Sequence, residues 1–96
     1  MKGTRTTRTV YYWLRLVNEK TVDFVSLGLL ISKSYVRAIE AGQKKPSIRL
    51  RRSYAKLFKI DENILIEFED IDKNNKMTTI NYLLKLLTAI GVEDIQ

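Results

Sequence analysis

The feature that most constrains this chain is a local pattern that recurs along it: a helix-capping residue followed by apolar residues three and four positions apart. In the first such stretch Thr9 precedes Val10, Trp13, Leu14 and Val17, which share one face of a helix. Similar stretches begin at Thr21, Ser32, Ser47, Asp61 and Thr78 or Thr79. No segment shows the strict alternation of apolar and polar residues that is typical of a half-buried strand. The sequence therefore predicts an all-α fold.

Changes in composition divide the chain into four segments. Residues 1–8 carry charge without apolar periodicity and are expected to form a flexible basic arm. Residues 9–69 contain five short helices of one domain, residues 70–78 read as a polar linker, and residues 79–96 contain a last, apolar helix. The expected architecture is a five-helix domain followed by a C-terminal helix.

The charge of the chain is distributed unevenly. Residues 1–60 contain 14 Lys and Arg against three acids, a net charge of +11, and residues 61–96 contain three Lys against eight acids, a net charge of −5. A basic half of this kind favours contact with a polyanion such as double-stranded DNA, whereas an uneven but merely solvated surface is the alternative. The acids of the second half are interpreted as a solvated face that keeps this side away from DNA: Glu62, Glu67, Glu69, Asp70 and Asp72.

Several functional classes are disfavoured by what the sequence lacks. Cysteine and histidine are both absent, which excludes disulfides, thiolate nucleophiles, histidine bases and metal sites built from thiol or imidazole. We therefore expect no metal, no cofactor and no enzymatic activity. No run of about 18 apolar residues is present, and the N-terminus lacks the apolar stretch of a signal peptide. A cytoplasmic protein without membrane contact is expected.

The segment from Thr21 to Gly42, with the residues just after it, carries the most specific motifs. It contains Ile-Ser-Lys-Ser-Tyr-Val at 31–36 and Ile-Glu-Ala-Gly at 39–42, and Lys-Pro-Ser follows at 45–47. As a set, these motifs resemble the lambda-repressor-like, Cro/XRE-type helix-turn-helix family over about residues 10–66. The resemblance implies a five-helix DNA-binding domain whose recognition helix spans about residues 32–41.

Three positions depart from the family pattern. Leu30 occupies the place of the usual turn glycine, where a left-handed backbone is costly for leucine, and Gly28 lies inside the preceding helix. We therefore expect the turn to be rearranged by about one residue. Val22 replaces a glutamine that in the family helps to hold a phosphate, and valine has no polar group for that contact.

The resemblance places candidate DNA contacts on and around the recognition helix. A helix that enters the major groove by its N-terminus presents its first turn to the base edges. The base-reading positions are Lys33, Ser34, Tyr35, Arg37 and Ala38. The candidate phosphate contacts are Ser32, Lys44, Lys45 and, in the basic arm, Arg5 and Arg8, and the positive surface is extended by Arg49, Arg51 and Arg52, some of which face away from any duplex.

Each of these contacts has a structural alternative. Ser32 is also a helix cap, Tyr35 can be a partly buried aromatic residue, and the loop lysines and the arm can be solvated chain. The resemblance further implies a salt bridge between Arg15 in the first helix and Glu40 at the end of the recognition helix, with a structural role.

The C-terminal helix is too apolar for a single buried stripe. Residues 80–90 contain eight apolar residues in eleven, so two surfaces require burial. We expect one surface to pack on the domain and the other to form a homodimer, although a helix buried entirely within the monomer is the alternative. The candidate dimerisation residues are Ile80, Leu83, Leu84, Leu87 and Ile90.

Together these observations predict a sequence-specific DNA-binding transcriptional regulator, by default a repressor, that reads the major groove as a homodimer. The alternative is a protein-interaction module on a helix-turn-helix scaffold, such as an antitoxin or an antagonist of a related regulator. In that case a protein partner would bind the C-terminal helix.

Overall fold

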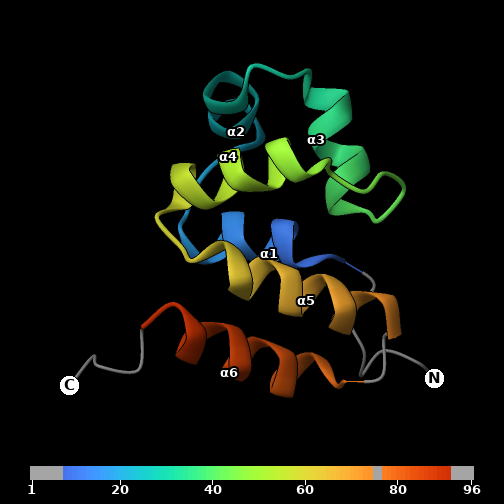
Figure 1. Cartoon of the computed structure of the whole chain (residues 1–96), viewed down its shortest axis with the longest axis vertical. Coiled ribbons are helices and arrows are strands. Elements are labelled where there is room, and N and C mark those ends of the chain that lie inside the picture. The colour runs from blue at the N-terminus through green and yellow to red at the C-terminus, as the bar shows by residue number, and fades with distance from the viewer. Residues whose placement is uncertain (1–7, 75–76, 92–96) are drawn as a thin grey trace.

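Six α-helices and no strands make up residues 8–74 and 77–91, the part of the chain described by the structure, which is a computed structural model (Figure 1). In chain order the helices are α1 (Val10–Val17), α2 (Val22–Leu29), α3 (Lys33–Glu40), α4 (Ile48–Phe58), α5 (Glu62–Asn74) and α6 (Thr79–Ala89). The prediction of an all-α protein is confirmed. Among these helices none is long and apolar enough to cross a membrane.

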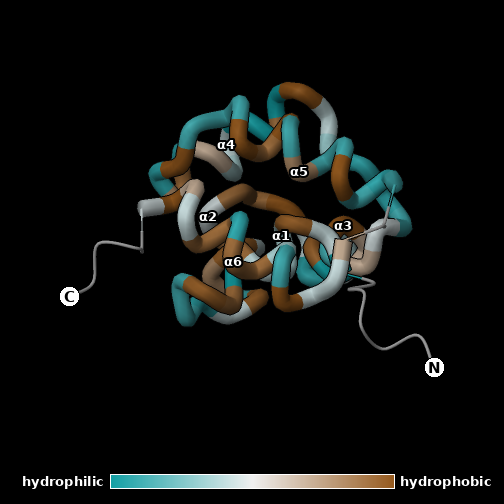
Figure 2. Tube along the Cα trace, turned by 90° about the horizontal axis from the view of Figure 1, so that it is seen from below, coloured by the Kyte–Doolittle hydropathy of each residue, from teal (hydrophilic) through white to brown (hydrophobic). Residues whose placement is uncertain are grey.

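Local capping chemistry sets where most of the helices begin. At four helix starts a Ser or Thr hydroxyl accepts a hydrogen bond, at 3.0 to 3.2 Å, from the backbone N–H three residues further on: Thr21, Ser32, Ser47 and Thr78. Each bond satisfies one of the N–H groups that a first helical turn leaves unpaired. Hydrophobic and hydrophilic residues are interleaved along the helices in Figure 2, as amphipathic helices require. These helix starts could therefore be predicted from the sequence.

The N-terminus of α1 is held in a different way. Thr9 precedes the helix, but its hydroxyl donates to the backbone oxygens of Ile39 and Glu40 at 3.0 and 3.2 Å. The N–H of Val10 instead donates to the carboxylate of Asp72 in α5 at 2.9 Å. The first helix is thus capped by a residue that is remote in the sequence.

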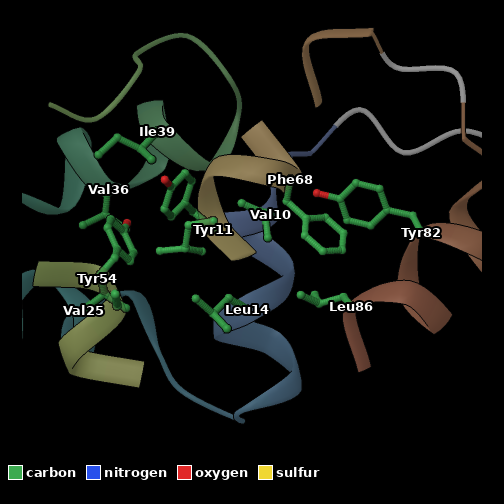
Figure 3. Close-up of a cluster of buried hydrophobic side chains, with 12 residues drawn as sticks. Val10, Tyr11, Leu14, Val25, Val36, Ile39, Tyr54, Phe68, Tyr82 and Leu86 are labelled. Carbon is green, nitrogen blue, oxygen red and sulfur yellow. The ribbon is translucent and has the colours of Figure 1, made fainter. Parts of the chain in front are cut away.

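The hydrophobic core surrounds α1, which packs against both α3 and α5. Its residues Val10, Tyr11 and Leu14 are buried. In Figure 3 they lie between Val36, Ile39 and Tyr54 on one side and Phe68, Tyr82 and Leu86 on the other. Because α1 is covered from more than one direction, its buried arc is wider than a single stripe.

This central position explains two core assignments that the apolar spacing missed. Tyr11 does not belong to the stripe predicted for the first helix, yet it is buried, whereas Val17 is only partly buried. The first helix ends at Val17.

Helix α5 continues to Asn74, five residues into the segment that we expected to be a linker from residue 70. Two of its last residues explain the extension, because Ile71 packs against the core and Asp72 accepts the Val10 hydrogen bond. The polar composition of this segment was therefore misleading. One of its polar residues, Asp72, is a carboxylate that accepts hydrogen bonds within the protein.

Helix α6 packs on the body of the protein through one face. Tyr82 and Leu86 are buried, and the Tyr82 ring meets the Phe68 ring edge-on with centroids 5.1 Å apart. Leu83 and Ile90, two of the expected dimerisation residues, also pack against the core. The sixth helix is therefore part of the same helical assembly as the other five.

The residue that joins α1, α5 and α6 is Asp72. Its carboxylate accepts hydrogen bonds from the Val10 N–H and, at 2.5 Å, from the Tyr82 hydroxyl. Burial raises the pKa of this carboxyl from 3.8 to about 6, although both hydrogen bonds favour the charged form. The native protein consequently holds this proton more tightly than the unfolded chain does.

This difference predicts a pH-dependent stability. A raised native pKa contributes stability that is complete below about pH 4 and is lost as the pH rises through about 6. Urea unfolding of wild type and Asp72→Asn should therefore show the wild type losing free energy of unfolding relative to the variant over that interval. Asp70→Asn, the same change at an exposed position of α5, is the matched control. A wild-type-to-variant difference that stays constant with pH would contradict the assignment.

Candidate nucleic-acid interface

The turn between α2 and α3 is built around Leu30, the residue that ends α2. Leu30 adopts φ 58° and ψ 45°, the left-handed conformation, at the end of α2. The Ile31 N–H donates to the Ser26 backbone oxygen at 3.1 Å, and the Ser26 hydroxyl donates to the Ile31 oxygen at 2.5 Å. These bonds hold Leu30 in a left-handed conformation that would cost about 1 kcal/mol less for glycine than for leucine. Leu30 thus adopts the left-handed conformation that we expected to be costly for leucine.

Gly28 has a packing role. A Cβ atom at this position would lie 2.9 Å from Cδ1 of Leu57, which belongs to α4. The missing side chain therefore lets Leu57 pack directly against the backbone of α2. Val22, at the position of the family glutamine, packs against the core and offers no polar group.

A buried ion pair clamps α3 to α1. The Arg15 guanidinium donates to both oxygens of the Glu40 carboxylate, from Nε at 2.6 Å and from Nη2 at 2.9 Å. The Glu40 side chain is only 3% exposed, and its hydrogen bond raises the pKa of Arg15. The Glu40 backbone oxygen also accepts from the N–H of Thr9 at 3.0 Å. The expected salt bridge is present, and it is reinforced by contacts to the backbone.

This clamp determines which side of α3 faces outward. Val36 and Ile39 are buried against α1, and Tyr35 and Ala38 are partly buried. The residues of α3 that remain exposed are Lys33, Ser34 and Arg37. The five expected base-reading residues are therefore divided, with three on the open face and two at its edge.

Lys33 has one partner on the surface. Its Nζ lies 3.2 Å from the Asp23 carboxylate of α2, and both side chains are more than half exposed. An exposed pair of this kind contributes about 1 kcal/mol or less. The pair orients Lys33, and because it is weak the ammonium group can exchange Asp23 for another anion.

The expected phosphate contacts have different surroundings. Ser32 uses its oxygen as the α3 cap, while Lys44 and Lys45 are exposed in the connection between α3 and α4. Arg8 is exposed, with its guanidinium 4.9 Å from the centre of the Tyr12 ring. Arg5 lies outside the described residues.

The positive surface of α4 is smaller than the sequence indicated. Arg51 turns toward α5, where it pairs with Glu62 at 3.3 Å and Glu69 at 3.2 Å. Arg52 pairs with the same Glu62 at 3.3 Å. These arginines stabilise the packing of α4 on α5. Arg49 is exposed and pairs with neither Glu62 nor Glu69.

Comparisons with known proteins add no constraint to this geometry. No protein-family model matches the chain, and no curated protein or solved structure matches it either. Within residues 8–74 and 77–91 there is also no cluster of acids that could hold a metal ion.

The buried clamp predicts a specific stability effect. Glu40→Ala leaves the Arg15 charge without its partner, which should lower the free energy of unfolding by about 3 kcal/mol. Urea unfolding should be measured for Arg15→Ala, Glu40→Ala and the double variant Arg15→Ala/Glu40→Ala. The double variant should lose much less free energy of unfolding than the sum of the losses of the two single variants. Glu67→Ala, which breaks the exposed pair with Lys85, should cost about 1 kcal/mol or less. Near-wild-type stability of Glu40→Ala would contradict a stabilising role for this ion pair.

Proposed function

We propose that this protein is a sequence-specific DNA-binding regulator of transcription that acts in the cytoplasm. In this proposal α2, the turn at Leu30 and α3 form a helix-turn-helix of the lambda-repressor-like kind, and α3 is the recognition helix. The observation that carries the proposal is the outward face of α3. It presents Lys33, Ser34 and Arg37 on a helix whose opposite face is clamped to the body of the protein.

The residue types on this face suit the major groove. A helix fits the width of that groove, and hydrogen-bond donors there discriminate between base pairs. Lys33, in the first turn, can donate to guanine O6 and N7, and Arg37, one turn later, can do the same or bind a phosphate. Ser34 can serve as donor or acceptor. We assign Tyr35 mainly to support of the helix, because its side chain packs against the core.

Phosphate contacts supply most of the affinity in this mechanism. Lys44 and Lys45 lie in the connection that follows α3 and add two exposed charges. Neutralising phosphates releases counterions, so the affinity falls steeply with salt concentration and depends little on the bases contacted. Repression then results when the bound protein occludes a promoter.

The proposal predicts a selectable DNA sequence. Selection from random duplexes at low salt should enrich one motif with the wild type, and Lys33→Ala or Arg37→Ala should relax the preference at one or two positions, with losses of about 1 to 3 kcal/mol. Lys56→Ala, on the last turn of α4, is the matched control and should keep the motif. Circular dichroism should show each variant folded, since all three side chains are exposed.

The absence of any enriched motif would contradict sequence-specific binding. If the protein instead formed a stoichiometric complex with another protein and bound no DNA at low salt, the scaffold would serve as an interaction module. The two functions are therefore separated by one binding assay.

We propose that the regulator acts as a homodimer through α6. Of the expected dimerisation residues, Leu83 and Ile90 pack against the core, Leu87 is partly buried, and Ile80 and Leu84 are 71% and 59% exposed. Ile80 and Leu84 lie one turn apart on the outward face of α6 and form an apolar ridge. A two-fold dimer would read two half-sites about 34 Å apart.

The ridge predicts a measurable change of mass. Leu84→Glu should shift the solution mass from dimer to monomer, because a charge on the ridge cannot be buried cheaply between two copies. Leu27→Glu places the same change at an exposed leucine of α2 and should leave the mass unchanged. A wild type that is monomeric at all concentrations tested would exclude dimerisation through α6 without excluding DNA binding.

A further inference from the structure

A pocket forms where three segments that are distant in the sequence meet. Its volume is about 240 Å³, and it lies between the start of α1, the connection from α3 to α4, and the C-terminal half of α5. In Figure 1 that connection and the end of α5 lie on the same side of the molecule as α3. The residues that matter for its charge are Glu69, Asp72, Lys44, Lys45 and Lys73.

The two acids of this pocket are satisfied from inside the protein. Glu69 accepts hydrogen bonds from Arg51 at 3.2 Å and from the Tyr11 hydroxyl. Asp72 accepts from the Val10 N–H and the Tyr82 hydroxyl. All four carboxylate oxygens thus have a donor, and the negative charge of Glu69 is balanced by Arg51.

The three lysines of the pocket have no such partners. Lys44, Lys45 and Lys73 are exposed, and among the described residues none of them forms an ion pair, in contrast to Lys33 and Lys85. The carboxylates of Glu69 and Asp72 bond to donors inside the protein. The ammonium groups of Lys44, Lys45 and Lys73, which come from two distant segments, line the same opening. These three lysine charges exceed the one lining carboxylate without a cationic partner, Asp72, and a net positive lining favours an anion.

The pocket also lies beside the C-terminal end of α3. Gly42, just beyond the end of α3, and Thr9, which bonds the last carbonyls of α3, both line it. The opening is therefore close to the end of the helix whose first turns carry Lys33 and Arg37. Lys73 belongs to a segment whose acids indicated a face kept away from DNA, but the fold brings it beside Lys44 and Lys45.

We propose that Lys73 joins Lys44 and Lys45 in one binding site for the phosphodiester backbone of duplex DNA. This site rests on the proposed DNA-binding function and adds α5 to its surface. Lysine acts as a flexible point charge, so the contact positions the duplex and carries no sequence information. The α5 helix consequently contributes affinity while α3 contributes specificity.

Salt dependence tests the site directly. The probe is a mixed-sequence DNA duplex of about 30 base pairs, titrated with the full chain at several salt concentrations. Loss of one phosphate contact should make the slope of log affinity against log salt about 0.9 less steep for Lys73→Gln and for Lys44→Gln. The affinity of each variant relative to wild type should then differ about threefold between 50 and 200 mM salt. Lys56→Gln, an equal loss of charge on α4, should retain the wild-type slope.

The outcomes separate this site from the function on which it rests. If wild type binds the duplex and Lys73→Gln retains its slope, the site is wrong and DNA binding stands. If wild type binds no duplex even at low salt, both fail. A further arm adds inorganic phosphate at constant ionic strength, which should not compete. Competition that depends on Lys73 would identify a free-phosphate site and overturn the assignment to the DNA backbone.

Discussion

The buried charge of Glu40 is the constraint on which the rest of this structure depends. A carboxylate that is almost fully removed from water requires a paired, hydrogen-bonded partner, and Arg15 supplies one through two bonds. The backbone oxygen of the same residue is bound by Thr9. Because Arg15 and Thr9 belong to α1 and its cap, these bonds tie the end of α3 to the central helix. The position of α3 is therefore set at its C-terminus.

The N-terminus of α3 is set by a different device. Leu30 takes a left-handed backbone that is costly for leucine, and the bonds between Ser26 and Ile31 hold it there. Leu30 itself is 89% exposed, so its side chain gains little from burial in this chain. The turn at Leu30 holds the N-terminus of α3, and the Arg15–Glu40 ion pair holds its C-terminus. With both ends held, α3 presents one face outward. Any reading of DNA by this helix depends on that face.

Much of the fold could be predicted, whereas the candidate site could be predicted only in part. The capping residues and apolar spacings indicated six helices, and the start of α3 at Ser32 followed from its hydroxyl and the motif around it. Tyr35 was assigned to base reading, but the core takes up much of its side chain. Arg51 was counted as positive surface, but two acids of α5 neutralise it. Both differences arise because a side chain's partner lies on another helix.

The sequence by itself determined the local elements: which segments become helices, where most of them begin, and which half of the chain carries the positive charge. These properties depend on residues within three or four positions of one another, so they are visible in one dimension. Only the tertiary structure decided that Asp72 caps α1, that α5 runs through the expected linker, and that Lys73 lies beside Lys44 and Lys45. Those outcomes depend on burial and on pairing between distant residues, which local spacing does not encode.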